Sequence, residues 1–229
     1  MTPPLTIAID GPSGSGKSSV SKAVASRLGV GYLDTGAMYR ALTWWCIDRC
    51  VDLTDVDAVA AAARELPLEI GTDPGVASVL VGGTDVTEAI RTTEVSTAVS
   101  AVATNAEVRP VLQRLQRDLM ARIAEQTGGV VAEGRDITTV VAPDARVRVL
   151  LTASEDARLR RRSAELHGTA EPSAVEATRD QVLRRDRDDS TVSTFTEAAE
   201  GVVLVDTSDL DFDESVEAVL DVVAAQTAE

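Results

Sequence analysis

A glycine-rich segment near the N-terminus has the residue types and spacing of a phosphate-binding loop. Gly11-Pro12-Ser13-Gly14-Ser15-Gly16-Lys17-Ser18 fits the pattern G-x-x-x-x-G-K-[ST]. Glycines let consecutive backbone amides turn toward a phosphate, and a following helix adds the positive end of its dipole. Lys17 would reach the outer phosphates, and the Ser18 hydroxyl would ligate Mg²⁺. Together with Ser19, the segment predicts a site for ATP or GTP.

The segments on either side of this loop match the order that such a site needs. Residues 5–9 form a short apolar strand candidate. Residues 17–28 follow as a helix candidate with Val20, Ala23, Val24 and Leu28 on one face. An ordinary glycine-rich turn is the alternative, but the strand–loop–helix order favours nucleotide binding.

The charge of the chain restricts its partners. Its 22 basic and 37 acidic residues give a net charge of −15 and a pI near 4.5. No basic surplus exists to replace the counterions of a nucleic acid, so such a partner is not expected. An anionic substrate must instead be held by local arginines, whose planar guanidinium binds phosphate in a bidentate manner.

Several arginines stand in positions that fit this requirement. Four follow or open motif-like segments, and four more form a dense run; in order they are Arg40, Arg91, Arg109, Arg135, Arg158, Arg160, Arg161 and Arg162. The dense run has two interpretations: a solvated helix face, or a mobile lid that brings charge to a transferred phosphoryl group.

A carboxylate follows an apolar strand candidate in the middle of the chain. The strand at 130–132 ends in Glu133, followed by Gly134-Arg135-Asp136. At the C-terminal edge of a strand beside the phosphate loop, Glu133 could hold the Mg²⁺ shell through water. A merely solvated strand end is the alternative.

The remaining composition indicates a protein of the reducing cytoplasm. Cys46 and Cys50 are four apart, toward the end of a helix expected at about 35–49. With the single His167 they are too few for a zinc site. The first strand begins almost at once, which leaves no room for a signal peptide, and no apolar run is long enough to span a membrane.

Strand and helix candidates alternate, which predicts an α/β fold with a mostly parallel sheet flanked by helices. The 229 residues fit one domain, 1–229. Two short apolar runs around Asp73-Pro74-Gly75, followed by Gly82-Gly83, predict a β-rich antiparallel insertion at 64–104 that binds substrate. A helical lid is expected at 154–172. Further elements are expected at 31–33, 55–64, 107–125, 147–151, 172–189, 202–205 and 213–225.

The class of nucleotide protein follows from what surrounds the loop. GTPases need an N/T-K-x-D motif to recognise guanine, and the sequence contains no such motif. Motor ATPases usually place an Asp-Glu pair at the end of a strongly apolar strand, whereas Glu133 is single. Transfer of a phosphoryl group to a second phosphate would explain the number of arginines, because several anionic groups must then meet.

The motifs, taken in order, resemble those of the bacterial cytidylate kinases, a family of nucleoside monophosphate kinases with the P-loop fold. The resemblance spans the chain nearly end to end. It rests on residues 9–17, Leu33-Asp34-Thr35-Gly36-Ala37-Met38-Tyr39-Arg40, Ile90-Arg91-Thr92-Thr93-Glu94-Val95, Glu133-Gly134-Arg135-Asp136 and Arg185-Asp186-Arg187-Asp188-Asp189-Ser190.

The resemblance implies transfer of the terminal phosphoryl of ATP to CMP or dCMP with Mg²⁺. By position, Ser100, Arg109 and Asp136 would recognise cytosine. This is chemically sensible, because a carboxylate accepts from the amino group of cytosine and repels the carbonyl that uracil has there. Arg109 supplies donors for the ring acceptors, and Ser100 can serve either edge.

The same resemblance assigns the rest of the site. It places the acceptor phosphate on Arg40 and Arg135, with Tyr39 packing nearby, and the sugar on Arg185 and Asp189, unless these two belong to a helical salt-bridge ladder. Thr35 would contact substrate while capping its helix. The residues implied in catalysis are Lys17, Arg135, Arg158 and Arg162.

Two positions depart from the family pattern. Relatives commonly carry an arginine where this chain has Val192, and some have aspartate where it has Glu133. UMP, AMP or an alcohol such as shikimate remains an alternative acceptor, and a non-catalytic nucleotide switch is the rival class. Family membership also implies a monomer.

Overall fold

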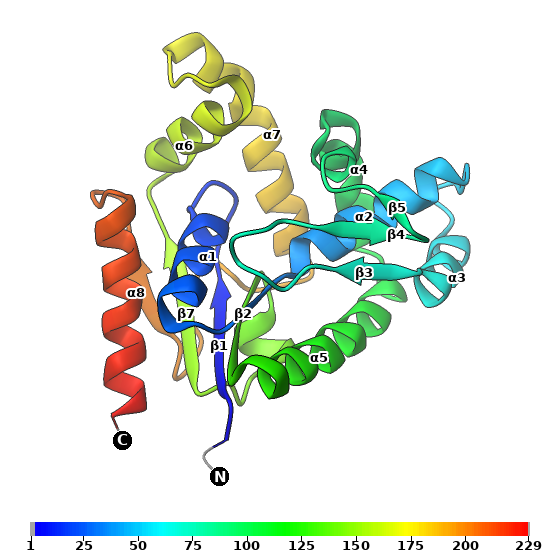
Figure 1. The fold of residues 1–229 in the computed structure, drawn as a ribbon. Coiled ribbons are helices and arrows are strands. Elements are labelled where there is room, and N and C mark those ends of the chain that lie inside the picture. Colours follow the sequence, from blue (N-terminus) through cyan, green and yellow to red (C-terminus); the bar gives the residue numbers. More distant parts are fainter. Residues whose placement is uncertain (1–2, 229) are drawn as a thin grey trace.

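The computed structural model describes residues 3–228, and its centre is a five-stranded sheet (Figure 1). The strands run in the order β2-β6-β1-β7-β8, and every neighbouring pair is parallel. Their bounds are β1 Leu5–Asp10, β2 Gly31–Asp34, β6 Gly129–Gly134, β7 Val147–Thr152 and β8 Val203–Asp206. The predicted α/β fold with a mostly parallel sheet is confirmed.

Helices cover both faces of this sheet. Helices α1 (Lys17–Leu28) and α8 (Phe212–Thr227) pack on the face that Ile7 and Ile9 of β1 point to. Helices α2 (Thr35–Asp48) and α5 (Val108–Thr127) pack on the other face, which Ala8 of β1 points to. Because both faces are buried, the strands are apolar at nearly every position rather than alternating.

A second, smaller sheet lies within the insertion expected at 64–104. Strands β3 (Leu68–Ile70), β4 (Val79–Val81) and β5 (Thr84–Asp85) form it, and both pairings are antiparallel. The third strand was not expected. It follows the turn at Gly82 and Gly83, whose φ angles of 58° and 79° suit a tight hairpin.

Helices surround the small sheet and connect it to the main one. Helix α3 (Val56–Glu65) precedes it, and the turn η1 (Ala89–Arg91) and helix α4 (Thr93–Ala103) follow it. Val79 and Val81 of β4 pack with Ala37 and Ala41 of α2 in one apolar cluster. The small sheet therefore rests on the helix that leaves strand β2.

Helices α6 (Glu155–His167) and α7 (Pro172–Ser190) form an arm beyond the C-terminal edge of the main sheet (Figure 1). The two helices pack against each other, and α7 also contacts α4. Both occupy segments in which the sequence predicted helices. The arm therefore reaches from the phosphate loop, beneath α6, to the side of the molecule that carries the insertion.

Two smaller observations concern the chain as a whole. Within residues 3–228, no helix has the length and apolar character to cross a membrane. The helix expected at 35–49 ends at Asp48, so Cys50 lies beyond it and not on it. Cys50 has a φ of 54°, which a helix interior does not allow, and it is exposed whereas Cys46 is buried.

Candidate active site

A cavity of about 430 Å³ opens at the C-terminal edge of the main sheet. Its volume falls in the range of sites for small ligands. Its walls come from the phosphate loop, from α2 and α4, from the end of β6, and from α6 and α7. Among the lining residues are Ser13 to Ser19, Thr35, Tyr39, Arg40, Arg91, Ser96, Val99, Ala103, Arg109, Glu133, Arg135, Asp136, Arg162, Glu165, Arg185, Asp189 and Ser193.

The phosphate loop depends on glycines for its shape. Gly14 has a φ of 76°, and a side chain there would also meet the Arg158 carbonyl of the arm. Gly11 has no positive φ, but a Cβ would lie 2.2 Å from the Leu151 carbonyl oxygen. Helix α1 starts directly after the loop, at Lys17, so its N-terminal amides face the cavity edge. The loop and helix have the geometry of an anion site.

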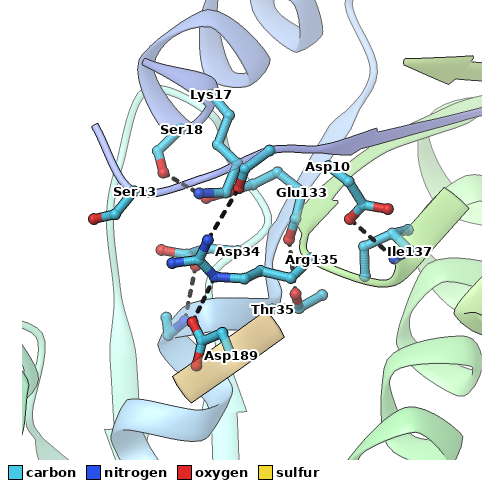
Figure 2. A network of polar contacts seen from close by, with 12 residues as sticks. Asp10, Ser13, Lys17, Ser18, Asp34, Thr35, Glu133, Arg135, Ile137 and Asp189 are labelled. Carbon is cyan, nitrogen blue, oxygen red and sulfur yellow. Dashed lines mark hydrogen bonds and ion pairs between the residues drawn. The ribbon is translucent and has the colours of Figure 1, made fainter. Parts of the chain in front are cut away.

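Glu133 meets both reactive side chains of the phosphate loop (Figure 2). The Ser18 hydroxyl donates to Glu133 Oε1 at 2.6 Å, and Lys17 Nζ lies 3.8 Å from Glu133 Oε2. The Tyr32 hydroxyl donates to the same Oε1 at 3.2 Å. Three side chains, two from α1 and one from β2, therefore fix one carboxylate beside the place where a nucleotide phosphate would lie.

Burial shifts the pKa values of this group. Burial, followed by the nearby Asp34 charge, raises the pKa of Glu133, although Lys17 and Ser18 oppose the shift. Burial likewise lowers the pKa of Lys17, against the stabilising charge of Glu133. Burial makes both charged forms costly, and the opposite charges of Lys17 and Glu133 offset part of that cost.

Asp34 organises the start of α2. Its carboxylate accepts from the Ala37 amide at 2.7 Å and from Arg40 Nη2 at 3.0 Å, while Arg91 Nη2 lies 3.9 Å away. Burial would raise the pKa of Asp34, but Arg40, the amide and Arg91 outweigh it and hold the pKa below its usual value. Asp34 is therefore the N-cap of α2 and also aims Arg40.

The expectation that Thr35 caps this helix is wrong. Thr35 is the first helical residue, and its hydroxyl donates to the Glu133 carbonyl oxygen at 2.7 Å. The N-cap needs extended backbone, and Asp34, with φ −85° and ψ 94°, provides it. Thr35 instead connects α2 to the end of β6 and lines the cavity.

Asp136 and Arg109 form a polar pair on the opposite wall. Arg109 Nη2 lies 2.6 Å from Asp136 Oδ2, and Gln113 Nε2 donates to the same oxygen at 2.8 Å. Among the described residues, no hydrogen bond engages Asp136 Oδ1. The pair thus presents a fixed acceptor beside a fixed donor, which suits a ring that carries both functions.

A buried carboxylate behind the cavity holds the Asp136 segment. Asp10, at the end of β1, accepts from the Ile137 amide at 3.0 Å, and from the Thr138 amide and hydroxyl at 2.8 Å and 2.6 Å (Figure 2). Burial raises the pKa of Asp10 to about 6, although these donors oppose the shift. Asp10 therefore couples the strand before the phosphate loop to the segment that follows Asp136.

Arg135 lies between the two walls. Its Nε lies 2.6 Å from Asp189 Oδ2, its Nη1 lies 3.0 Å from Asp186 Oδ1, and Nη1 also donates to the Gly11 carbonyl oxygen at 3.5 Å. The ring of the buried Phe195 lies 4.4 Å from its guanidinium carbon. Figure 2 shows the guanidinium between the phosphate loop and Asp189.

Arg185, which belongs to α7, lies near Arg135. Its Nε is 3.8 Å from Asp189 Oδ2 and, within the described part of the chain, has no hydrogen-bond partner. Burial, and then the charges of Arg135 and Arg40, lower the pKa of Arg185 to about 10. A buried donor that faces other cations fits an anionic or hydroxyl-rich ligand.

The sequence allowed two interpretations of the arginines of α6, a solvated helix face or a lid that brings charge to the phosphoryl group, and each fits some of them. Arg158 Nη1 donates to the Ser13 carbonyl oxygen at 3.0 Å and contacts Asp186, and Arg162 lines the cavity. Arg161 donates to the Ser15 carbonyl oxygen at 3.3 Å and to Thr207 Oγ1 at 2.9 Å. Arg160 alone is exposed. Two of the four therefore contact the phosphate loop and a third lines the cavity, so the run is not simply a solvated face.

Comparisons with known proteins agree with this geometry. The family model described as cytidylate kinase matches residues 7–225. The chain belongs to the cytidylate kinase family. A cytidylate kinase of Streptomyces avermitilis is 49% identical, with 99% of this chain and 95% of the relative covered. The cytidylate kinase of Cutibacterium acnes is 50% identical over 97% of both chains, and that of Nocardia farcinica is 48% identical over 97% of this chain and 95% of its own length.

Most residues that the cytidylate kinase resemblance implied lie around one cavity. The exceptions are Ser100, Gly11, Pro12 and Arg158, which are outside its lining. On α4 the wall is made by Ser96, Val99 and Ala103, which share one stripe of the helix; Ser100 is half-buried at the edge of that stripe. The contact of Ser100 with the cytosine base stays a prediction. Ser193, next to Val192, lines the cavity instead of an arginine.

Sequence reasoning missed three charged residues of this cytidylate kinase site, Asp10, Asp34 and Asp186, and it named Arg161 without its partners. Each of the three lay inside a segment that was already singled out, but each was passed over. Asp10 and Asp34 directly follow apolar strands, which was the same signal that identified Glu133. Asp186 lies 173 residues from Ser13 and 28 from Arg158, and Arg161 lies 46 residues from Thr207, so no local pattern reveals these partners.

Proposed function

We propose that the residues lining this cavity carry out the reaction of the cytidylate kinase family, with ATP and CMP or dCMP bound in two adjoining halves. The donor half is the phosphate loop with Lys17 and Ser18. The acceptor half is formed by side chains of α2, α4, α5, α7 and the end of β6. The observation that carries the proposal is the convergence of Arg40, Arg109 and Arg135 with Lys17 on one cavity.

In the donor half, the loop from Gly11 to Ser19 binds the ATP phosphates through its amides and the N-terminus of α1. Lys17 neutralises the outer phosphates, and its lowered pKa reflects a burial that a polyanion would compensate. Arg162, which reaches the cavity from α6, adds charge beside the transferred phosphoryl group.

In the acceptor half, Asp136 and Arg109 recognise cytosine. Asp136 Oδ1 accepts from the amino group, and Arg109 donates to the ring acceptors, while Ser100 on α4 remains a candidate contact. A carbonyl at the amino position, as in uracil, would leave the buried carboxylate without a donor, so UMP is disfavoured.

The acceptor phosphate and the sugar bind nearer to the phosphate loop. Arg40 and Arg135, with Tyr39 against them, hold the phosphate, and Arg185 with Asp189 holds the sugar hydroxyls. The buried Nε of Arg40 and of Arg185 has no hydrogen-bond partner among the described residues, which fits donors that serve a ligand.

The chemistry needs alignment and charge stabilisation more than a general base. An oxygen of the acceptor phosphate forms the new bond to the terminal phosphorus of ATP, and the bond from that phosphorus to the bridging oxygen breaks, so that ADP leaves with the electron pair. The acceptor is already anionic, so no side chain must remove a proton. Lys17, Arg135 and Arg162 stabilise the charge that spreads over the transferred group, and Arg158 holds α6 against the loop.

The donor set beside the loop fits Mg²⁺. Ser18 and Glu133 are hard oxygen ligands 2.6 Å apart, yet among residues 3–228 no cluster of three acidic, histidine or cysteine side chains could hold a metal alone. Mg²⁺ tolerates such a sparse set because water and phosphate oxygens complete its shell. When bound, it supplies charge neutralisation at the phosphates. Ser18 would ligate it, and Glu133 would orient its water.

The segments 64–104 and 154–172 lie at the edges of the cavity, and their positions suggest their roles. The insertion at 64–104 supports Arg91 and the α4 wall and acts as the acceptor-binding subdomain. The segment 154–172 acts as a lid over the loop. From the family resemblance and the net charge of −15, we propose a cytoplasmic monomer with no nucleic-acid partner. Size-exclusion chromatography with light scattering would test the oligomeric state.

An acceptor panel tests the proposed function. The purified protein is incubated with ATP, Mg²⁺ and CMP, dCMP, UMP, AMP or shikimate, and ADP release is coupled to NADH oxidation. Rapid turnover is expected with CMP and dCMP, slower turnover with UMP, and none above background with AMP and shikimate. Equal or faster rates with UMP or AMP would reject recognition of the base by Asp136, and absence of any phosphorylated product would reject the kinase.

A further inference from the structure

The carboxylate of Asp186 lies where three separate parts of the molecule meet. Its Oδ1 accepts from the Ser13 amide at 3.0 Å and lies 3.0 Å from Arg135 Nη1, and its Oδ2 contacts Arg158 Nη1. The side chain of Asp186 is 13% exposed. The donors come from the phosphate loop, the end of β6 and helix α6, whereas Asp186 itself belongs to α7.

Together with Arg158, the Asp186 carboxylate hydrogen-bonds both backbone groups of one loop residue, Ser13. Asp186 accepts from the amide of Ser13, while Arg158 Nη1 donates to the Ser13 carbonyl oxygen at 3.0 Å. The Arg158–Asp186 ion pair closes the ring. Both helices of the arm thus contact the same loop residue, Ser13, and α6 also contacts the loop through Arg161 at Ser15.

The same carboxylate fixes the orientation of Arg135. Asp186 contacts Nη1, Asp189 contacts Nε, and the Phe195 ring covers the guanidinium. These contacts use Nε and Nη1, and a guanidinium has five N–H donors in a rigid fork. The Nη2 group is therefore held at a set position relative to the phosphate loop, which is what a group that stabilises a transferred phosphoryl needs.

We propose that Asp186 is a positioning residue for phosphoryl transfer: it aligns Arg135 and Arg158 with each other and locks α6 and α7 onto the peptide of Ser13. This inference rests on the proposed function. Asp186 touches no reacting atom. It acts through the two arginines, so its loss should slow the chemical step while the loop amides and Lys17 still bind ATP.

Asp186→Asn tests the proposal, because it keeps the size of the side chain but removes its charge and one acceptor. We expect kcat for CMP phosphorylation to fall about 10²-fold, with the KM for ATP changed by less than about threefold, since uniform binding is untouched. Asp180→Asn is the matched control, an exposed carboxylate on the same helix, and should keep the wild-type kcat. A thermal melt and ATP titration confirm that each variant is folded.

Two further variants separate positioning from general damage. In an Arg158→Ala background, Asp186→Asn should cost at least tenfold less than in the wild type, because residues that act as one unit have non-additive effects. Asp186→Glu keeps the charge and should recover part of the lost kcat, and it also serves if Asp186→Asn does not fold.

The outcomes distinguish this inference from the function beneath it. A wild type that phosphorylates CMP, with Asp186→Asn equally fast, overturns the positioning role alone. Multiplicative effects of Asp186→Asn and Arg158→Ala also overturn it, because they indicate independent structural losses. A wild type and Asp180→Asn that both lack CMP kinase activity overturn the proposed function and, with it, the role of Asp186.

Discussion

The two halves of the cavity are built in different ways. The donor half is nine consecutive residues, 11–19, and its binding groups are mainly backbone amides and a helix N-terminus. The acceptor half gathers side chains from at least four elements, and its best-defined pairs, Arg109 with Asp136 and Arg135 with Asp189, are 27 and 54 residues apart in sequence.

Because of this difference, the two halves are suited to different kinds of recognition. Backbone amides bind any phosphate, so the donor half depends on glycine conformations at Gly14 and on one cation, Lys17. In the proposed function the acceptor half distinguishes one base from another, which requires donors and acceptors at fixed positions. Those positions come from tertiary structure, and each arginine there is held by a carboxylate, as Arg40 is by Asp34 and Arg109 is by Asp136.

The pairing also explains how an acidic chain accepts anionic substrates. The net charge is −15, yet the cavity wall collects Arg40, Arg91, Arg109, Arg135, Arg162 and Arg185. Carboxylates such as Asp34, Asp136 and Asp189 contact these groups and reduce their mutual repulsion, and the Nε groups of Arg40 and Arg185 have no hydrogen-bond partner among the described residues. The local field, and not the net charge, determines what binds.

Removal of the group that contacts both halves should have the largest effect. Arg135→Ala takes away a guanidinium that lies between the phosphate loop and Asp189, the proposed sugar ligand, so we expect kcat to fall about 10³-fold. Steady-state kinetics with both substrates varied measures it. Arg122→Ala, which changes an exposed arginine on α5, is the control and should match the wild type. A loss confined to the KM for CMP would place Arg135 in the acceptor half alone.

A change within the acceptor half should alter selectivity and leave the donor half intact. Asp136→Ala removes the acceptor for the cytosine amino group and leaves Arg109 unpaired, so kcat/KM for CMP should fall about 10²-fold. The preference for CMP over UMP should shrink with it, while the KM for ATP stays near the wild-type value. Unchanged selectivity would show that another residue distinguishes the bases.

Replacement of Glu133, which contacts Lys17 and Ser18 of the donor half, should raise the Mg²⁺ concentration that activity needs. Glu133→Gln keeps the hydrogen-bonding size but removes the charge next to Ser18, so the Mg²⁺ concentration for half-maximal activity should rise about tenfold. Titration of Mg²⁺ at saturating ATP and CMP measures it. The ratio of rates with CMP and UMP should not move, and a shift in that ratio would mean that Glu133 acts on the acceptor half instead.

Asp10, which connects strand β1 to the segment after Asp136, should have a smaller, pH-dependent effect on the free energy of unfolding. The folded-state pKa of Asp10 is about 6, above the ordinary 3.8, so the folded form holds its proton where the unfolded form has lost it. Stability from this group is complete below pH 4 and is lost as the pH rises through 6, by about 1 kcal/mol between pH 5 and pH 6. Urea unfolding of Asp10→Asn should lack this decline, and parallel curves for both proteins would contradict the assignment.

The two halves also differ in how far the sequence alone could predict them. The loop, both flanking elements and the parallel sheet followed from local pattern, and helix α1 matched its predicted bounds. The α5 and α7 helices differed by one or two residues at their ends. Hydrophobic period and glycine spacing are local properties, which is why they were sufficient for these elements.

The acceptor half needed a family resemblance because its contacts are long-range. No spacing rule links Arg109 to Asp136 or Arg135 to Asp189. The interpretation of Thr35 as an N-cap failed by one residue, since Asp34 and Thr35 are both good caps and only the backbone angles distinguish them. The roles of the cavity residues remain predictions from chemistry and position.

A crystal structure with CMP and a non-transferable ATP analogue tests the central claim most directly. The account predicts the cytosine amino group within hydrogen-bond distance of Asp136, the CMP phosphate on Arg40 and Arg135, and the terminal phosphate of the analogue beside Lys17. A CMP molecule bound away from these residues, with Arg135 directed at neither phosphate, would contradict it.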